Sequence, residues 1–471
     1  MFQVAETPVA LQVNDVHSKL SQSLVQSIAR PARPAQVVQA VESARREEQP
    51  LACCGGRHAM GGQQFVSGGI LLDMGGMNRI LDFNPDQGTL SVEAGIQWPE
   101  LIQGYLALQE GSDAPWGLRQ KQTGADRMSV GGSLAANIHG RVLDAGPLIQ
   151  DVVSFEVVNA DGEILRCSRE ENAELFSLVI GGYGLFGVVT SAELQLVPRQ
   201  KVERVVEIAD LDGLDQRVED RISAGYLYGD FQFVTDPRRD DFMRRGVFSC
   251  YKPVSQDRPI PCDQTYMTPD RWQALLLYAH TEKSRAFDEF AGFYLSTSGQ
   301  VYWSDTHQLA YYLDDYHDEL NKNLCAEHQG SEMITELYVP RHRLGEFMTL
   351  AAQSIRQTGA DLIYGTVRMI RRDQESFLAW ARGDFACVVL NLHVNHSPAG
   401  VSEAASSFRG LIDIALDLEG SYFLTYHRFA SADQLETGYP QFRQFLRLKD
   451  RYDPDGVFVS DWYRDYAARM E

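Results

Sequence analysis

The chain has 471 residues, a length that suggests more than one domain. Of these residues 44% are hydrophobic and 23% charged, which is the balance of a globular protein. Its formal charge of −21 argues against a nucleic-acid-binding protein, because no basic run of useful length offsets the acidic excess. No apolar run approaches the ~18 residues that a membrane helix needs, so we expect no transmembrane segment.

Two further features bear on the compartment. The first residues, MFQVAETPVALQVNDV, lack a basic region and contain two acidic side chains, so we expect no signal peptide. The seven cysteines are odd in number and irregularly spread, which suits a reducing compartment better than a disulfide framework. Together they predict a soluble, cytoplasmic protein whose oligomeric state the sequence leaves open.

The first elements in chain order alternate between helix and strand. A helix is expected from Pro34, with Val37, Val38, Val41 and Ala44 on one apolar face. An apolar strand follows Pro50, and three more strand candidates come after it, namely GGILLDM, RILDFN and TLSVEAGI. This pattern predicts an α+β lobe.

Two glycine-rich segments, CGGRHAMGG at 54–62 and SVGGSLAANIHG at 129–140, each carry one histidine. Glycine lacks Cβ, so backbone in such a segment can approach a large anionic cofactor closely, and a neighbouring histidine supplies chemistry. One loop histidine, His58 or His139, is more often a hydrogen-bonded surface side chain. Two such segments in this order indicate a flavin cradle.

A third glycine segment, GGYGLFG at 181–187, matches the GxGxxG spacing of dinucleotide-binding proteins. That fingerprint must open a helix, whereas the residues that follow, VVTSAELQL, are β-branched and strand-like. A nicotinamide site of the Rossmann type is therefore not expected. Just before it, VVSFEVVNADGEILRC predicts a hairpin with its turn at NADG, and a helix is expected near 171–178.

Beyond residue 200 the glycine segments stop and longer segments rich in Tyr, Trp, Phe and Asp begin, which predicts a second domain. Its histidines and carboxylates at 307–319 do not have the spacing of a compact metal site, and we interpret them as a solvated acidic helix face. The tail, FRQFLRLKDRYDPDGVFVSDWYRDY, predicts a helix ended by Asp453 and Pro454 and then a short aromatic strand.

The segment ACVVLNLHVNH at 386–396 predicts a strand with unlike faces. Val388, Leu390, Leu392 and Val394 share one face, whereas Cys387, Val389, Asn391, His393 and Asn395 share the other. The polar face either meets water or lines a polar pocket, and we favour the pocket. The same count aligns Tyr364, Thr366 and Arg368 in LIYGTVRMI, and Phe423, Thr425 and His427 in SYFLTYHRF.

The order GGRHAMGG, VEAGIQWPEL, SVGGSLAANIHG, GGYGLFGVVT and KDRYDPDGVFVSDW resembles the FAD-linked oxidases of the vanillyl-alcohol oxidase type, with a PCMH-type FAD-binding domain. Within them it is similar to the branch of sugar-alcohol and aldonolactone oxidases and decaprenylphosphoryl-ribose oxidase. The resemblance covers the first two hundred residues and the tail, and the middle only loosely.

The resemblance implies an α+β fold: a two-subdomain FAD-binding lobe and an α+β cap domain with an antiparallel sheet over the flavin. We expect the FAD-binding domain at 1–200, the cap or substrate domain at 201–430, and a C-terminal return to the FAD domain at 431–471.

The cofactor implied is FAD, and no metal is expected. His58 falls where some members attach the flavin covalently through its 8α carbon, although Ala59 replaces their serine, so both covalent and noncovalent FAD stay open. The residues that match the family's FAD-binding stretches are Gly55, Gly56, Arg57, His58, Ala59, Met60, Gly61, Gly62, Gly124, Ser129, Val130, Gly131, Gly132, Ala136, Asn137, Ile138, His139 and Val189.

On the substrate side the resemblance implies an arginine, here Arg368, that stabilises negative charge near the flavin. His427 falls where relatives carry a lysine, so the identity of the general base is open among His393, His427 and His139. Asn391 and Tyr364 are the candidates that hold substrate hydroxyls.

The reaction implied is FAD-dependent oxidation of a CH–OH group on a polar, sugar-like or polyol or lactone substrate. Hydride would pass to flavin N5, with molecular oxygen as the acceptor of the electrons. Two alternatives stay open at this point: a flavin dehydrogenase or epimerase-system oxidase that uses a quinone or protein acceptor, and a binding or scaffold protein without redox function.

Overall fold

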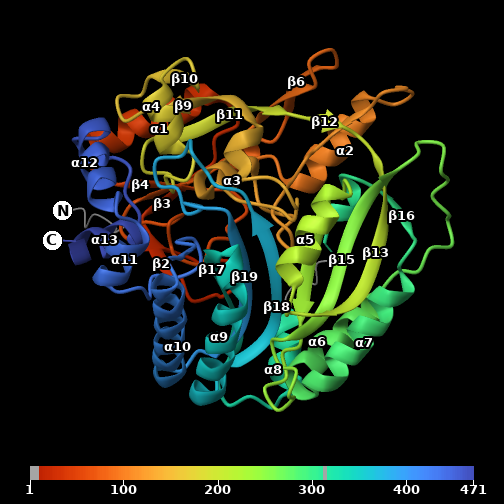
Figure 1. Cartoon of the computed structure of the whole chain (residues 1–471). Helices are drawn as coiled ribbons and strands as arrows, with labels where there is room; N and C mark the ends of the chain where they lie inside the picture. The colour runs from red at the N-terminus through yellow and green to blue at the C-terminus, as the bar shows by residue number, and fades with distance from the viewer. Residues whose placement is uncertain (1–9, 311–315, 471) are drawn as a thin grey trace.

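The computed structural model describes residues 10–310 and 316–470 (Figure 1). The first two hundred residues, red to yellow in Figure 1, form one lobe together with the blue helices α12 (Phe442–Tyr452) and α13 (Asp461–Met470), and the green and cyan residues form a second lobe around a large sheet. Both lobes mix helices with sheets, which confirms the predicted α+β class. No helix among the described residues combines the length and the apolar character of a membrane-spanning segment.

A three-stranded parallel sheet begins the first lobe, in the order β3 (Ser27–Ala29), β5 (Ile70–Asp73), β4 (Leu51–Cys54). Helix α1 (Pro34–Arg46) starts at the predicted proline and packs its apolar face on this sheet. The first glycine segment therefore leaves the end of a buried strand. A small antiparallel pair, β1 (Leu11–Val13) and β2 (Ser23–Val25), precedes the sheet.

A five-stranded antiparallel sheet completes the lobe, in the order β10-β9-β11-β7-β6. The predicted hairpin is present, with NADG between β9 and β10, and the segment after GGYGLFG is strand β11, as predicted. The bounds are β6 (Ile80–Asn84), β7 (Thr89–Glu93), β9 (Val152–Val158), β10 (Ile164–Ser168) and β11 (Val188–Gln195), with helices α2 (Trp98–Leu108), α3 (Val130–Ala136) and α4 (Ala173–Val179).

The C-terminal segment returns to the first lobe. Helix α12 (Phe442–Tyr452) ends where predicted, just before Asp453. The Asp453 carboxylate then accepts hydrogen bonds from the backbone amides of Val457, at 2.8 Å, and Phe458, at 2.7 Å. Phe458 then forms a parallel bridge with Leu51 of β4.

The predicted aromatic strand after this bridge is wrong, because residues from Asp461 form helix α13 (Asp461–Met470). Ser460 Oγ accepts a hydrogen bond from Tyr463 N at 3.1 Å and so caps the helix. Trp462 and Tyr466, four residues apart, both turn into the core. Aromatic composition favours a strand locally, but packing of Trp462 and Tyr466 on the lobe favours the helix.

The second lobe is an eight-stranded antiparallel sheet in the order β16-β13-β15-β14-β18-β19-β17-β20. Its long central strands carry the polar residues singled out in the sequence. The bounds are β13 (Lys201–Asp210), β14 (Tyr228–Phe233), β15 (Arg245–Val254), β16 (Val301–Trp303), β17 (Gly330–Pro340), β18 (Asp361–Ile370), β19 (Phe385–Asn395) and β20 (Ser421–Tyr422). The helices are α5 (Leu214–Ser223), α6 (Pro269–Thr281), α7 (Lys283–Ser296), α8 (Tyr316–Asn323), α9 (Leu344–Thr358), α10 (Pro398–Asp417) and α11 (Ala432–Gly438).

The two faces of this sheet differ in character. Across β17, β19 and β18, Glu336 pairs with Val389, and Arg368 with Cys387, so their side chains share one face, which we call the inner face. The opposite, outer face is apolar and is covered by α9 and α10, seen in front of the sheet in Figure 1. The inner face is met by the first lobe and by α6 and α8.

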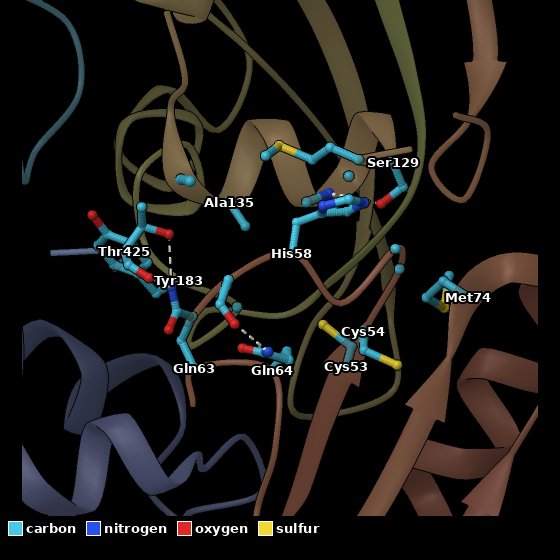
Figure 2. A pocket seen from close by; sticks show the side chains of 18 of the residues that line it. Cys53, Cys54, His58, Gln63, Gln64, Met74, Ser129, Ala135, Tyr183 and Thr425 are labelled. Carbon is cyan, nitrogen blue, oxygen red and sulfur yellow. Dashed lines mark hydrogen bonds between the residues drawn. The ribbon is translucent and has the colours of Figure 1, made fainter. Parts of the chain in front are cut away.

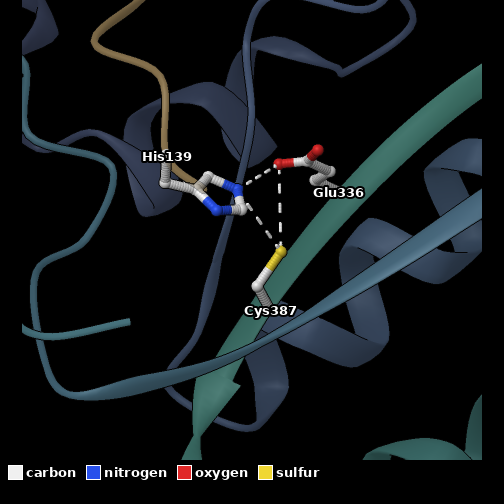
Figure 3. A group of neighbouring side chains, drawn as sticks. All are labelled: His139, Glu336 and Cys387. Carbon is white, nitrogen blue, oxygen red and sulfur yellow. Dashed lines mark hydrogen bonds and ion pairs between the residues drawn. The ribbon is translucent and has the colours of Figure 1, made fainter. Parts of the chain in front are cut away.

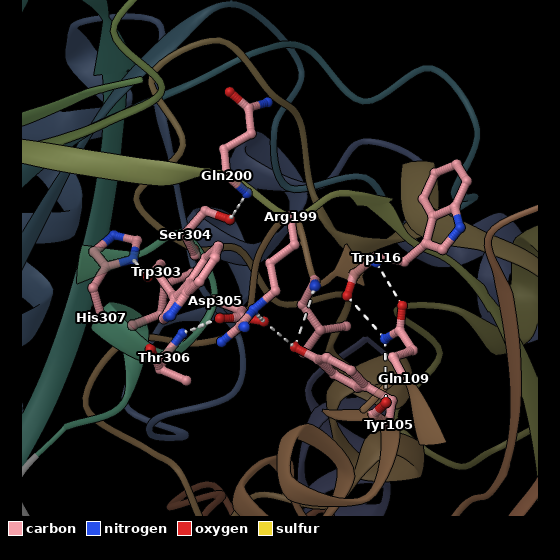
Figure 4. Close-up of polar contacts among 12 residues, drawn as sticks. Tyr105, Gln109, Trp116, Arg199, Gln200, Trp303, Ser304, Asp305, Thr306 and His307 are labelled. Carbon is pink, nitrogen blue, oxygen red and sulfur yellow. Dashed lines mark hydrogen bonds and ion pairs between the residues drawn. The ribbon is translucent and has the colours of Figure 1, made fainter. Parts of the chain in front are cut away.

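A buried carboxylate joins the two lobes (Figure 4). Asp305, fully buried, accepts hydrogen bonds from the Tyr105 hydroxyl of α2 and from Arg199 Nε, each at 2.7 Å. Arg199 lies between β12 (Val197–Pro198) and β13, and its guanidinium stacks 4.2 Å from the Trp303 ring centre. These contacts connect the two lobes next to β13 and β16 of the large sheet.

Tyr105→Phe tests this junction. Loss of the hydroxyl removes one donor from a buried carboxylate, and hydrogen bonds to charged groups contribute about 1.5–3 kcal/mol. We expect the free energy of unfolding, measured with urea, to fall by that amount. Tyr266→Phe is the matched control because Tyr266 is 64% exposed and should change nothing. Equal stabilities of the two variants would contradict the role given to Asp305.

The described residues of the segment 307–319 belong to different elements. His307, in a short 3-10 helix, meets the Tyr228 ring edge-on at 4.6 Å between ring centres, whereas His317 to Glu319 lie on α8. Asp318 and Glu319 are exposed on α8, as predicted, but His317 is buried, so the interpretation of a solvated face is wrong for it. Asp314 and Asp315 lie outside the described residues. The domain boundaries at 200 and 430 stay our proposal.

Candidate functional site

A long cavity opens between the three-stranded sheet, α3, β11 and the segment after β20 (Figure 2). It encloses about 1050 Å³, counting the part that is open to solvent. The predicted residues that line it are Gly55, Gly56, Arg57, His58, Ala59, Ser129, Gly131, Gly132, Ala136, Ile138 and Val189.

The two glycine segments meet in this cavity. A Cβ atom added to Gly55 would lie 1.9 Å from Ser129 Oγ, and one added to Gly56 would lie 2.0 Å from the Arg127 carbonyl oxygen. Glycine is therefore required here for the two segments to touch. The second segment is not a loop throughout, because Val130 to Ala136 form helix α3, capped by Ser129.

Seven predicted FAD-binding residues do not line the cavity. Asn137, in the left-handed conformation at the end of α3, donates from Nδ2 to Asp373 Oδ2 at 2.9 Å and so ties α3 to the second lobe. Gly61 packs against Trp462 of α13. The full set is Met60, Gly61, Gly62, Gly124, Val130, Asn137 and His139.

The cavity fits FAD in its shape and in its polar groups. Its wall is mostly backbone and apolar side chains, but the side-chain oxygens of Gln63, Gln64 and Gln122 are buried there without a hydrogen-bond partner among the described residues. Buried acceptors without donors are uncommon, and the amino, imide and hydroxyl groups of FAD are donors. These glutamines, none of which was predicted, would hold the cofactor with the glycine backbone.

His58 lies in the cavity with a second histidine behind it. Its Nδ1 is 2.8 Å from His17 Nε2, and Figure 2 shows the His58 ring beside Ser129. Burial, and secondly the neighbouring His17, lower the pKa of His58 to about 3. The imidazole is therefore neutral at physiological pH, the form in which a ring nitrogen acts as a nucleophile.

His139 leaves the cavity and reaches the inner face of the large sheet (Figure 3). Its Nε2 is 2.8 Å from Glu336 Oε2, and its Nδ1 is 3.0 Å from the Gly140 carbonyl oxygen. The ring is fully buried, and each of its nitrogens faces an oxygen acceptor within the protein. His139 is therefore engaged on both sides by the protein, which argues against a role as general base.

Glu336 is the centre of a dense buried cluster that the sequence analysis missed. The Tyr426 hydroxyl donates to its Oε1 at 2.7 Å, the Tyr338 hydroxyl donates to Oε2 at 2.9 Å, and Cys387 Sγ lies 3.8 Å from Oε2. Burial raises the pKa of Glu336, but the charges of His139 and Arg368 and the hydrogen bonds outweigh it and bring the pKa to about 2. The sequence does carry one signal for this cluster, because Glu336 is a charged residue inside the mostly apolar run ITELYV.

Three predicted catalytic residues lie together on the inner face. Asn391 pairs with Tyr364 across β18 and β19, and Arg368 lies four residues beyond Tyr364 on the same face. Arg368 is 5% exposed, yet its Nε and Nη1 have no hydrogen-bond partner among the described residues, and neither has Asn391 Oδ1. Tyr364 is 37% exposed. The face thus offers an unpaired cation and an unpaired acceptor beside an accessible phenol.

His427, predicted as a possible base, lies on the wrong side of the sheet. Its Nε2 is 3.3 Å from Thr335 Oγ1, and Thr335 precedes Glu336, so it points to the outer face. The ring stacks on Phe408 of α10 at 4.5 Å between ring centres. The period-two count placed Phe423, Thr425 and His427 on one strand, but β20 ends at Tyr422 and the chain turns. This placement removes His427 from the candidates for the base.

His427 instead makes the protein sensitive to acid. Burial lowers its pKa to about 3, below the ordinary value of 6.5, so protonation favours the unfolded chain. The stability it contributes is complete above pH 6.5 and is lost as the pH falls toward 3. At pH 5 the loss is about 2 kcal/mol. We expect His427→Gln to lose less stability than the unaltered protein between pH 7 and pH 5, as measured by urea unfolding, and parallel curves would contradict this.

His393, the third predicted base, is on the inner face, but at its far end. Its Nδ1 is 3.2 Å from Glu332 Oε1, and its ring contacts that of His280 at 4.9 Å between ring centres. Glu332 lies four residues before Glu336 on β17, so about 13 Å of strand separates the two carboxylates. His393 and His139 thus belong to two different clusters.

Comparison with known proteins agrees with this geometry. Residues 25–168 match the family described as FAD binding domain, and residues 300–466 match the family described as D-arabinono-1,4-lactone oxidase. L-Gulono-1,4-lactone dehydrogenase of Mycobacterium tuberculosis is 24% identical over 93% of this chain and 95% of its own. Cytokinin dehydrogenase 7 of Oryza sativa is 31% identical over 40% of this chain and 36% of its own. Cytokinin dehydrogenase 2 of Arabidopsis thaliana is 24% identical over 86% of this chain and 81% of its own.

Proposed function

We propose a reaction and a substrate class from one premise, that this chain belongs to the FAD-linked oxidases of the vanillyl-alcohol oxidase type and to their aldonolactone-oxidase branch. It is an FAD-dependent oxidoreductase. Our proposal is that it oxidises a CH–OH group of a sugar lactone, with oxygen as the acceptor. The observation that carries it is the set of unpaired buried polar atoms on the inner face, on Arg368 and Asn391.

Arg368 supplies the charge that such a reaction needs. Bound FAD supplies the acceptor for a hydride from the substrate carbon. Arg368 is buried near the Glu336 cluster, and although burial opposes its charge, Tyr364 and Glu336 raise its pKa above the ordinary value. A fixed cation in a site without water stabilises developing negative charge without reorganising. Its two unpaired nitrogens are the donors available for that purpose.

Asn391 and Tyr364 suit a polyhydroxylated substrate. The unpaired Asn391 Oδ1 accepts a hydrogen bond, and the Tyr364 hydroxyl both donates and accepts. Because the two residues are directly opposite each other on neighbouring strands, they present these groups side by side. We therefore propose that they hold hydroxyls of a sugar lactone. Of the predicted bases, His393 lies on this face outside the Glu336 cluster, and its contacts with Glu332 and His280 point to a different role.

The proposal is tested by mixing the purified flavoprotein with L-gulono-1,4-lactone and D-arabinono-1,4-lactone, the substrates named for its relatives. Without oxygen, we expect one of them to bleach the flavin absorption, and with oxygen we expect consumption of oxygen. Bleaching without oxygen consumption would indicate a quinone or protein acceptor. A flavin that neither lactone nor any related polyol reduces would overturn the proposed substrate class.

His58→Ala tests whether the cofactor is attached covalently. The neutral His58 ring lines the cavity, so we predict a covalent bond to the flavin. After precipitation with acid, the unaltered protein should give a yellow pellet. The variant should keep its fold and release yellow colour into the supernatant. His427→Gln, which alters a histidine outside the cavity, should behave like the unaltered protein. Colour in the supernatant from the unaltered protein would show noncovalent FAD.

A further inference from the structure

A second polar cluster lies on the inner face around Glu332 of β17. Three histidines from three different elements reach this carboxylate, which is 5% exposed: His280 of α6, His317 of α8 and His393 of β19. The cluster is not part of the Glu336 site, and the family resemblance gave no reason to expect it. A buried carboxylate among several imidazoles is the donor set of a transition-metal site.

The distances fit a shared ion. Glu332 Oε1 lies 3.3 Å from His280 Nε2 and 3.2 Å from His393 Nδ1, and the three ligand atoms all lie within 4.8 Å of one another. With metal–nitrogen bonds of about 2.0–2.1 Å, neighbouring ligand atoms of a tetrahedral zinc site are roughly 3.3–3.4 Å apart. The two measured separations from Oε1 match that spacing.

The hydrogen bonding of His280 also points to a missing partner. Its side chain is 2% exposed, yet neither ring nitrogen makes a well-directed hydrogen bond within the part of the chain that the structure describes. Leaving a buried polar group unsatisfied costs about 1–3 kcal/mol. A cation between His280, His393 and Glu332 would satisfy the ring nitrogen that faces the carboxylate.

The second carboxylate oxygen of Glu332, Oε2, contacts residues other than His280 and His393. Glu332 Oε2 lies 2.9 Å from His317 Nδ1 and accepts a hydrogen bond from the Tyr316 hydroxyl. Groups that hydrogen-bond a ligating carboxylate fix its orientation and strengthen metal binding. Tyr316 takes that place here through its hydrogen bond, and His317 lies at ion-pair distance from the same oxygen, so Oε1 is the oxygen near His280 and His393.

We propose that His280, Glu332 and His393 bind one divalent transition-metal ion, with His317 and Tyr316 as outer partners that orient the carboxylate. Two imidazoles and one carboxylate favour Zn²⁺ over Mg²⁺ or Ca²⁺, which prefer oxygen ligands. Three protein ligands leave a fourth position for water or another oxygen ligand.

This assignment replaces the base role predicted for His393. A neutral imidazole that binds a metal through Nδ1 keeps its proton on Nε2, so it has no lone pair left to accept another. The ion would join α6, β17 and β19, elements that are distant in the chain. Metal binding does not depend on the identity of the oxidised substrate, so it stands or falls separately from the proposed function.

The test is Zn²⁺ binding to the FAD-loaded protein after treatment with a chelator, by isothermal titration and by metal analysis after dialysis. We expect one Zn²⁺ per chain. Glu332→Gln and His280→Gln should each abolish stoichiometric binding. His317→Gln, which removes an outer partner, should weaken binding by about 10–100-fold. Co²⁺ bound in place of Zn²⁺ should give visible d–d absorption that is absent from the ligand variants.

The controls separate loss of the site from loss of the fold. The flavin spectrum and the thermal midpoint of each variant report folding, and His427→Gln is the matched histidine control that should bind Zn²⁺ normally. If the unaltered protein binds no Zn²⁺, or if both ligand variants bind it as tightly as the unaltered protein, the cluster is a hydrogen-bonded one and the proposal is overturned. Failure of the lactones to reduce the flavin would not affect this result.

Discussion

Arg368→Met is expected to lower the rate of flavin reduction by lactone about 10²–10³-fold, the effect of removing one preorganised charge-stabilising donor. The guanidinium is buried and two of its nitrogens have no partner among the described residues, so its charge is available to the reaction. Methionine keeps much of the volume and the apolar stem but removes the charge. Stopped-flow absorbance under anaerobic conditions measures the rate.

Two further readouts separate a charge effect from damage to the fold. The midpoint potential of the bound flavin should become more negative in Arg368→Met, because the cation favours the reduced, negatively charged form. Arg46→Met, on the exposed side of α1, is the matched control and should leave rate and potential unchanged. A normal potential together with a normal rate in Arg368→Met would remove Arg368 from the site.

Glu336→Ala is expected to cost about 3–5 kcal/mol of folding free energy, since removing one partner of a buried ion pair leaves the other charge uncompensated. His139 is fully buried, and the two tyrosine hydroxyls on Glu336 would also lose their acceptor. Glu336→Gln keeps an acceptor oxygen and should cost less. Urea unfolding of the two variants measures the difference, and equal costs would show that loss of the carboxylate charge alone accounts for the destabilisation.

The pH dependence of this variant gives an independent check. The pKa of Glu336 is about 2 in the folded protein, below the ordinary value of 4.5, so its stabilising contribution is complete above pH 4.5. It is lost as the pH falls from 4.5 toward 2. The stability difference between the unaltered protein and Glu336→Ala should therefore shrink over that range. A constant difference would mean that the carboxylate charge contributes nothing.

The cofactor segments were predictable because they are local. A glycine segment with a histidine is read from consecutive residues, and its backbone freedom does not depend on the rest of the chain. The same holds for the NADG hairpin and for the period-two faces of β18 and β19, which place Tyr364, Arg368 and Asn391 where the structure has them. Local periodicity fixes which residues share a face.

Errors arose where tertiary packing competes with local preference. The aromatic tail from Asp461 has strand-like composition but forms α13, since Trp462 and Tyr466 fill one side of the lobe only at helical spacing. The two-residue period that would place His427 on a strand face does not extend past Tyr422, where β20 ends. In both cases the competing interaction comes from residues far away in the sequence.

By itself, the sequence determined the fold class, the FAD cofactor and the faces of the cap strands, because glycine content, turn residues and periodicity are properties of neighbouring residues. The tertiary structure alone decided the pairing of His139 with Glu336 and the grouping of His280, His317 and His393 around Glu332. These contacts join residues that lie 15 to 197 positions apart. No local pattern encodes them, because burial and strand register, set by the whole chain, bring such side chains together.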